Sequence, residues 1–436
     1  SWPRPGARQP AAGPVMVRTL NALQVAALLV SASYGIGFLF GSGEHALQYG
    51  MAGAIYGVAT GLGMLAMAWF AGRLWRAGRA VWDLFGDRFG ERVRRLVALL
   101  SIVWMAGVLA AQIHGAVAVV RLLGAGVPWA QLIAVGLVFA ASRFDLRSAS
   151  IVFSVCLGAS ALALVFALVR AEGLTLYAHS VPAFAATLPL IGLAQGVTIG
   201  IGVGLLVCTG ADYHQFVLAA RDCRSAVGGC LLAGVALIFL AFLPPAVVMA
   251  SIAQPTWPGV ADAKQVLPQA LSMAARELTA IGGALMLAML GVAALGSGAA
   301  ILRAMVSALD SAQAGRMFLR PTALALIALG GATALTMSGL PIVDTMVSVN
   351  VVYIASVGVS LVGLLRDEPE QHVDETWVIS AGFTASIAVY LLTWIGGPIS
   401  NAELLSLSVG LASAMLARII LGRRERRDLA CRPSDR

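Results

Sequence analysis

The sequence predicts an all-helical membrane protein with about twelve transmembrane helices, and three observations lead to this fold class. First, 59% of the 436 residues are hydrophobic and only 11% are charged, whereas a soluble domain carries about 25% charged residues. Second, apolar runs of about 20 residues, the length that crosses a bilayer as a helix, recur along the chain. Third, arginines gather in alternate connectors between these runs. Together these features exclude a soluble enzyme.

The apolar runs can be placed as twelve transmembrane spans. In chain order they cover residues 19–49, 51–73, 96–123, 127–142, 148–169, 186–208, 225–252, 279–309, 321–339, 342–365, 376–396 and 402–421. Because their number is even, both ends of the chain are expected on the same side of the membrane.

The basic residues orient these spans. With both termini in the cytoplasm, 25 of the 29 Lys and Arg residues fall in cytoplasmic segments. The four others are Arg121, Arg170, Lys264 and Arg276. Cytoplasmic loops of membrane proteins carry an excess of Lys and Arg, and one missed helix would reverse the side of every later loop. We therefore expect an integral, multi-pass protein of the cytoplasmic (inner) membrane with cytoplasmic termini. The net charge of +8 reflects this topology and not a nucleic-acid-binding surface.

Four segments outside the spans have distinct characters. Residues 1–17 are rich in Pro, Gly and Arg and are expected to be disordered. Residues 75–95 are basic and amphipathic, which predicts an interfacial cytoplasmic helix. Residues 253–278 form a loop long enough to fold over the outer face, and residues 422–436 form a basic cytoplasmic tail.

Glycines interrupt the first and sixth spans. Residues 31–44 read SASYGIGFLFGSGE, and the sixth span carries several glycines before Thr209-Gly210. In transporters with internal repeats, binding sites lie where corresponding helices are broken. The two spans are five apart, which predicts a 5+5 inverted repeat. The repeats would cover about 19–169 and 186–365 within a core of residues 18–365, followed by two additional helices in 366–421. Alternatively, these glycines serve only close helix packing.

Ionisable side chains within spans are candidate functional groups because burying them is costly. Glu44 and His45 lie toward the outer end of the first span. They could bind a cationic group or carry a proton, or they could form an interfacial pair. Asp344, at the outer end of the tenth span, is a candidate gate or proton site together with Glu44. Asp212 follows the break in the sixth span and could line the inner exit or cap the next helical piece.

Two amides are candidates for hydrogen bonding to a solute. Gln112 lies on the third span and Asn350 on the tenth. Gln112 could equally bridge two helices. Asn350 and Tyr353 are spaced i, i+3 and would line the pathway together. Trp104, two turns below Gln112, is interpreted as a packing residue.

Three segments resemble sodium/solute symporters. AGRLWRAGRAVWDLFGDRFGERVRRL (71–96) resembles the cytoplasmic stretch between their second and third core helices. GADYHQFVLAARDCRSAVGGCLLAG (210–234) resembles the segment that follows their broken sixth core helix. VAALGSGAAILRAMVSALD (292–310) is similar to their eighth core helix. The resemblance runs in order over residues 19–365. It implies the LeuT-type fold of the APC superfamily and sodium-driven uptake of a small solute.

The resemblance also implies a sodium site between the first and eighth core helices. In the family, one Na⁺ binds two backbone carbonyls at the break of the first helix, and an alanine carbonyl and two hydroxyls on the eighth. The matching positions in this chain are Ser31, Tyr34, Ala294, Ser297 and Gly298. Gly298 departs from the pattern because it has no hydroxyl. Water or a substrate oxygen could replace this ligand; otherwise the site would be inactive.

The same resemblance implies a solute site at the two breaks. The positions at the breaks that are expected to contact the solute are Gly37, Phe38, Val207, Cys208 and Thr209, and the amides of Gln112 and Asn350 on the third and tenth spans complete the set. Small and apolar groups dominate this set. We therefore expect a small polar solute held largely by backbone groups.

These observations favour an ion-coupled secondary transporter that works by alternating access, with Na⁺ as the expected coupling ion. A bundle of spans 1, 2, 6 and 7 would rock against a scaffold of spans 3, 4, 8 and 9. Two alternatives remain: a proton-coupled or uncoupled transporter of the same fold, and a membrane sensor or receptor that does not transport. The expected partners are a small solute, Na⁺ or H⁺, and the lipid bilayer. No nucleophile–base set and no metal-ligand spacing is recognisable, so we expect no enzyme activity and no cofactor beyond Na⁺.

Overall fold

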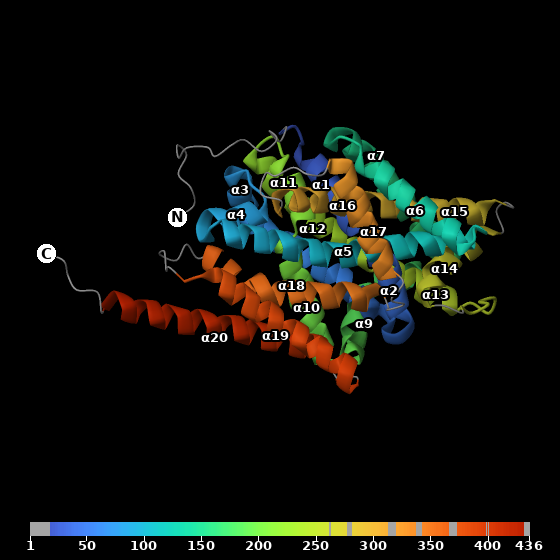
Figure 1. The fold of residues 1–436 in the computed structure, drawn as a ribbon. Helices are drawn as coiled ribbons and strands as arrows, with labels where there is room; N and C mark the ends of the chain where they lie inside the picture. Colours follow the sequence, from blue (N-terminus) through green and yellow to red (C-terminus); the bar gives the residue numbers. More distant parts are fainter. Residues whose placement is uncertain are drawn as a thin grey trace.

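The computed structural model describes residues 18–260, 263–276, 281–312, 320–336, 342–365, 373–397, 399 and 401–430. The segment 1–17, predicted to be disordered, lies outside these residues. The described chain is helical, and its one β-bridge pairs Leu20 with Ala220. A long bundle results, with α4 at one end and α13 and α14 at the other (Figure 1). The α4 end is the side predicted to be cytoplasmic.

The first half of the chain builds five spans and one connector helix. Its elements are α1 (Ala22–Ser33), α2 (Ile36–Tyr49), the 3₁₀ helix η1 (Gly50–Ala54), α3 (Ile55–Ala77), α4 (Val81–Phe89), α5 (Glu91–Leu122), α6 (Val127–Ser142) and α7 (Leu146–Arg170). The connector α4 buries Val81, Trp82, Leu84 and Phe85, so the amphipathic segment that is predicted to be cytoplasmic does form a helix, shorter than its predicted range.

The second half repeats this order and adds two helices. Its elements are α8 (Leu174–Ala178), α9 (Ser180–Thr187), η2 (Leu188–Ile191), α10 (Leu193–Thr209), α11 (Ala211–Leu218), α12 (Cys223–Ala241), α13 (Leu243–Ile252), η3 (Ala263–Gln265), α14 (Val266–Arg276), α15 (Gly282–Gly291), α16 (Ala293–Ala312), α17 (Pro321–Thr336), α18 (Ile342–Leu365), α19 (Glu375–Gly396) and α20 (Ala402–Ala430). Helices α19 and α20 lie along one side of the bundle (Figure 1).

The helical stretches account for all twelve predicted spans. Among the described residues, eight helices are long and apolar enough to cross a membrane, and one pair of helices joined at a sharp bend makes a ninth candidate. Three shorter apolar helices, Ala22–Ser33, Val127–Ser142 and Pro321–Thr336, fall on the first, fourth and ninth predicted spans. The all-helical fold class is therefore confirmed.

One predicted span boundary is wrong. The sixth span does not begin near residue 186, because Ser180–Ile191 meets α10 at 112°. Gly192 makes this turn with a φ of +81° that favours glycine. The last span agrees with its prediction, because the apolar membrane-spanning part of α20 covers Ala402–Arg423, although the helix itself continues to Ala430 into the predicted tail.

The first and sixth spans are both broken. Helix α1 starts with a capping box between Asn21 and Gln24 and ends at Tyr34, and Gly35 then adopts an extended conformation before α2. In the sixth span Gly210 is extended between α10 and α11. The breaks occur at equivalent positions of the two halves, as the inverted repeat predicts.

The helices form two packed groups. One contains α1, α3, α10 and α12, and the other contains α5, α6, α16 and α17. These are the helices predicted for the bundle and the scaffold. Helix α1 also contacts α16, so the break in the first span lies where the groups meet.

The starts of the first and seventh spans are joined through the backbone. The amides of Thr19 and Leu20 donate to the carbonyl of Ala219 at 3.0 and 3.1 Å, and the Arg221 amide donates to Leu20 O at 2.8 Å. Trp75 Nε1, at the end of α3, donates to Ala220 O at 2.7 Å. Three bundle elements therefore meet at the α4 end.

Candidate functional site at the two helix breaks

The break in the first span packs directly against the eighth. A methyl group placed on Gly35 would lie 2.6 Å from Ser297 Cβ and 2.8 Å from Ser297 Oγ. It would also collide with Oε1 of Gln112. Ser297 and Gln112 are both buried. The structure thus brings together the break, the predicted sodium ligand on α16 and the predicted amide on α5.

Ser31 lies beside the same turn of α16. A methyl group on Gly296 would lie 3.3 Å from the carbonyl oxygen of Ser31 and would collide with its Oγ. Ala294 belongs to the first turn of α16. The Tyr34 amide donates to Val30 O at 2.6 Å, and its carbonyl precedes the extended Gly35. Ser31 and Ser297 are therefore neighbours across the interface between α1 and α16.

Gly298 faces another helix. A methyl group there would meet the two γ carbons of Val138 on α6, each at 3.1 Å. Adjacent residues of a helix point about 100° apart, so Ser297 and Gly298 cannot face the same neighbour closely. The side chain of a serine or threonine at position 298 would therefore point towards α6 and not towards the break.

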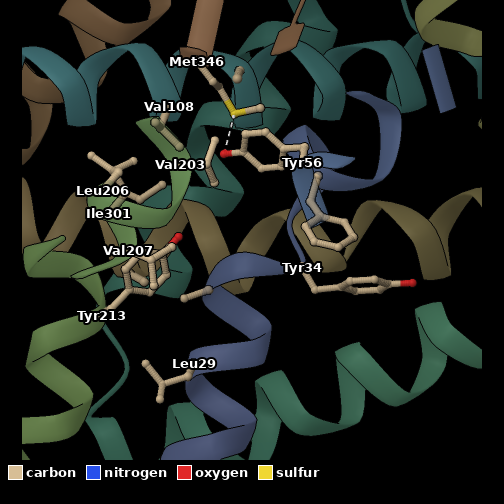
Figure 2. Close-up of a cluster of buried hydrophobic side chains, with 14 of the residues drawn as sticks. Leu29, Tyr34, Tyr56, Val108, Val203, Leu206, Val207, Tyr213, Ile301 and Met346 are labelled. Carbon is tan, nitrogen blue, oxygen red and sulfur yellow. Dashed lines mark hydrogen bonds between the residues drawn. The ribbon is translucent and has the colours of Figure 1, made fainter. Parts of the chain in front are cut away.

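Aromatic rings surround the start of α2. Phe38 packs against Tyr34 and Tyr56, with ring centroids 5.1 and 6.3 Å apart. Tyr56 Oη donates to Sδ of Met346 at 3.8 Å, and these side chains lie together in Figure 2. Met346 also lies against Gly37. Tyr56 and Met346 were missed from the sequence because one aromatic and one methionine in apolar spans carry no signal.

Asn350 lies at the centre of the core. It is fully buried, and neither Nδ2 nor Oδ1 has a hydrogen-bond partner among the described residues. Met346 and Tyr353 flank it on the same face of α18. Tyr353 reaches α5, where its ring packs 5.9 Å from Trp104 and its Oη accepts from Ser101 at 3.3 Å.

Trp104 is more polar in its setting than the packing interpretation implies. Its Nε1–H is buried and has no partner in the described part of the chain. Gln112, further along the same helix, differs from Trp104 because its Oε1 does have a partner: it accepts from the amide of Gly37 at 3.4 Å. A buried polar group without a partner costs about 1–3 kcal/mol. Asn350 and Trp104 therefore present unsatisfied hydrogen-bonding groups between α5 and α18.

The sixth-span residues Val207, Cys208 and Thr209 face elsewhere. A methyl group on Gly63 of α3 would lie 2.9 Å from Val207 Cβ. Cys208 Sγ donates to Gly63 O at 3.6 Å, and Thr209 Oγ1 donates to Leu205 O at 3.0 Å in its own helix. Val207 and Cys208 thus contact α3, and no described contact places these three residues at the first break.

Asp212 lies in the first turn of α11. The residue at the N-cap position is Gly210, and Asp212 lies two residues further on within the helix. The carboxylate is buried, and its Oδ1 has no hydrogen-bond partner among the described residues. The neighbouring Gln215 joins α11 to the eighth span by donating to Ala300 O at 3.0 Å.

Glu44 and His45 lie in the second half of α2, and both are buried. The His45 ring packs edge-on against Tyr49 with centroids 5.6 Å apart. Nearby, Gly43 faces Leu267 of α14 and Val248 of α13. This part of α2 is therefore covered by α13 and α14. The side chain of Asp344 lies outside the described residues.

No family model matches the sequence, and no curated protein matches it. Solved structures do match its fold. A Na⁺-coupled sialic acid symporter in a substrate-bound, outward-open state has a TM-score of 0.72 and 13% identity, with 93% of this chain and 90% of that chain covered. Mhp1, a nucleobase-cation-symport-1 family transporter in a closed conformation with bromovinylhydantoin bound, has a TM-score of 0.62 and 16% identity over 94% of each chain. A mutant manganese transporter of Eremococcus coleocola has a TM-score of 0.58 and 17% identity over 96% and 98%.

These matches cover nearly the whole chain in both directions, and they are transporters. They confirm the predicted LeuT-type fold. Among the described residues no group of three His, Cys, Asp or Glu side chains could hold a metal ion.

Proposed function

We propose that the protein is an ion-coupled secondary active transporter that moves a small polar solute across the cytoplasmic membrane, with Na⁺ as the coupling ion. The observation that carries this proposal is the packing of the first-span break at Gly35 against Ser297, with Ser31 beside the same turn of α16. An unwound turn in the middle of a membrane helix exposes carbonyl groups, and such groups need partners. A cation between α1 and α16 would provide one.

Sodium at this place would tie the bundle to the scaffold. Its protein ligands would be the carbonyls of Ser31, Tyr34 and Ala294 and the hydroxyl of Ser297. Hard cations prefer oxygen ligands such as these. Because Gly298 faces Val138, a water or solute oxygen would complete the shell. An ion that binds one arrangement of the two helix groups more tightly shifts the population toward it, and this differential affinity is the basis of alternating access.

The solute would bind next to this site, between α2, α5 and α18. Gly37 and Phe38 form one wall, and Gln112 and Asn350 supply amides on the other. Asn350 offers two donors and an acceptor, none of which has a partner among the described residues. A small polar solute would satisfy these groups, which a purely apolar one would leave desolvated. Thr209, the last residue of α10 before the extended Gly210, would contribute its backbone at the second break, whereas Val207 and Cys208 lie against α3.

Sodium binding can be tested without knowing the solute. We expect NaCl to raise the thermal stability of the purified protein in detergent relative to KCl at equal ionic strength. Ser297→Ala should reduce this sodium-specific shift. Ser356→Ala is the matched control, because Ser356 is equally buried but donates only to Val352 O of its own helix. An equal sodium response in wild type and Ser297→Ala would contradict the assignment of the ion site.

Transport itself requires uptake measurements. Solutes that raise the thermal stability would be tested for uptake into proteoliposomes, with sodium and pH gradients imposed separately. Accumulation that depends on the sodium gradient would support the proposal. If no stabilising solute accumulates under either gradient, the protein is better explained as a sensor or receptor.

Proton coupling is the second candidate, and Asp212 favours it. Its buried carboxyl group, whose Oδ1 has no partner within the described part of the chain, lies on the broken sixth span. Buried carboxyl groups in membrane helices often carry protons. Uptake driven by the pH gradient alone, and abolished by Asp212→Asn, would establish this alternative.

A further inference from the structure

A lipid-facing groove runs along α3 and α10, away from the proposed solute site. Its larger cavity has a volume of about 490 Å³ and extends from Ile55 to Ala66 on α3. A second cavity of about 390 Å³ continues from Ala66 to Arg73. Ala66, Leu205 and Cys208 line both cavities, so the two cavities adjoin and are treated together as one groove.

The floor of the groove is made by small residues. Gly63 and Ala59 of α3 face Gly200 and Gly204 of α10. A methyl group on Gly200 would meet nothing within 4 Å. The walls are exposed apolar side chains, with Leu62 54% and Ile201 43% exposed. The groove is therefore open, apolar and unfilled by the protein.

The length of the groove matches half a bilayer or more. Ile55 and Arg73 are 18 residues apart on one helix, which corresponds to about 27 Å at 1.5 Å per residue. The hydrocarbon core of a bilayer is about 30 Å thick. An acyl chain is the flexible apolar molecule that this shape and this surrounding would accept.

The α4 end of the groove carries two polar groups among mostly apolar side chains. Arg73 lines the cavity and is exposed, and it makes no ion pair within the described chain. His214 lines it as well. The His214 Nε2 lies 2.9 Å from the carbonyl of Cys208, which assigns the proton to Nε2. Its Nδ1 is then a buried acceptor, and it has no partner among the described residues.

We propose that this groove binds one anionic glycerophospholipid. One acyl chain would lie between α3 and α10, the phosphate would bind Arg73, and a headgroup hydroxyl would donate to Nδ1 of His214. Arginines near a membrane surface attract anionic headgroups. Trp69, which is 89% exposed and lines the same cavity, lies where membrane helices carry aromatic residues at the interface.

The proposal is tested with the delipidated full-length protein in detergent by native mass spectrometry. The probes are dioleoyl phosphatidylglycerol, dioleoyl phosphatidylcholine with the same chains, and glycerol 3-phosphate with none. We expect one tightly bound phosphatidylglycerol, weaker phosphatidylcholine and no binding of glycerol 3-phosphate. Equal binding of the two lipids would contradict the assignment of Arg73 and His214 to the headgroup. Competition by glycerol 3-phosphate would contradict the assignment of the acyl chain to the groove.

Two pairs of variants locate the lipid. Gly200→Leu fills the groove from its floor and should weaken phosphatidylglycerol binding at least fivefold. Gly136→Leu, on α6, also meets open space and should bind as wild type. Arg73→Gln should lower the affinity for phosphatidylglycerol about fivefold, to that of phosphatidylcholine. The exposed Arg143, outside the groove, provides the control Arg143→Gln.

The outcomes that contradict the proposal are distinct. If Gly200→Leu and Gly136→Leu bind lipid equally, the groove is not the site. If Gly200→Leu instead converts a dimer to a monomer, a second copy of the chain occupies the groove. If Gly200→Leu fails to fold, the wild type still tests the proposal. Phosphatidylglycerol should then slow the alkylation of Cys208 by N-ethylmaleimide but not that of Cys156 on α7, and equal rates would overturn it.

Discussion

Gly35 and Ser297 are in contact at the point where the first span is broken: a methyl group on Gly35 would come within 2.6 Å of Ser297 Cβ. Gly35→Ala should therefore push α1 and α16 apart. Overpacking of this kind costs about 1–3 kcal/mol. We expect a lower melting temperature and a loss of the sodium-specific stabilisation.

The double variant Gly35→Ala with Ser297→Gly tests the cause of this effect. Removing the Ser297 side chain relieves the contact with α16 but leaves the one with Oε1 of Gln112, so stability should recover in part while the sodium response stays absent. Gly331→Ala, in a helix position with open space, should be neutral to stability. If the double variant is no more stable than Gly35→Ala, the contact with Ser297 is not the source of the cost.

Asn350→Leu should make the protein more stable and less functional. The amide of Asn350 is buried and has no partner among the residues that the structure describes, so replacing it by an apolar group of similar size removes a desolvation cost of about 1–2 kcal/mol. Thermal denaturation should show the gain, and binding of a stabilising solute should be lost. Ser386→Ala is the contrasting control, because Ser386 and Ser406 satisfy each other at 2.6 Å and its removal should destabilise. A less stable Asn350→Leu would show that the amide has a structural partner.

Glu375→Ala should destabilise the contact of α18 with α19 and α20. Glu375 accepts from Ser360 Oγ at 2.5 Å, and Arg418 Nε lies 3.5 Å from its carboxylate. Loss of one partner of a buried ion pair is costly, but the side chain of Arg418 is 18% exposed and keeps some hydration, so we expect about 2 kcal/mol. Melting temperatures would measure it. The variant Glu375→Ala with Arg418→Ala should lose less than the sum of the single losses, and strict additivity would exclude the pairing.

Arg94→Gln should produce a stability deficit that shrinks as the pH falls. Hydrogen bonding from Arg94 lowers the pKa of Glu91, whereas burial raises the pKa of Asp83 and the charge of Arg94 opposes that rise. A lowered pKa contributes stability that is lost as pH falls through it, so the wild type loses the Glu91 contribution in acid. A carboxylate with a raised pKa is destabilising above that pKa, so the variant recovers as Asp83 is protonated.

We expect a deficit of about 1 kcal/mol at pH 8, since the pairs are partly exposed. The deficit should be smaller at pH 4.5 in thermal denaturation. Arg92→Gln, which removes an exposed neighbouring arginine, should show neither effect. A deficit that is constant across this range would mean that Arg94 acts through its bond to Ser311 on α16.

The two breaks could be predicted because glycine interrupts otherwise apolar spans, but their positions could not. Four glycines mark residues 35–43, and only Gly35 is at the break. Gly37 and Gly43 instead allow Met346 and Leu267 to pack closely. A glycine has the same sequence signal whether it ends a helix or admits a neighbour. The bend at Gly192 was missed for the converse reason, since apolar residues continue on both sides of it.

The direction of side chains limited the prediction of the site. The position of Asn350 in the core could be predicted, because a lone amide in an apolar span is costly to bury unless it has a function. Cys208, by contrast, was expected at the solute site and faces Gly63 and the lipid groove. Helices that are apolar all round carry no periodicity that tells one face from another. Gly298 is a similar case, because correspondence to a family position does not reveal that it faces Val138.

The backbone bonds between Leu20 and the segment 219–221 have a mechanical consequence. They fasten the entry of α1 to the exit of α11, while extended glycines interrupt both spans further in, at Gly35 and Gly210. Helices α1 and α11, which lie on the α4 side of the two breaks, are thereby joined and would move together about Gly35 and Gly210. Neither helix can move outward at the α4 end without the other unless these three main-chain hydrogen bonds break first. Because the joint consists of groups that every residue but proline possesses, most side-chain substitutions would leave it intact.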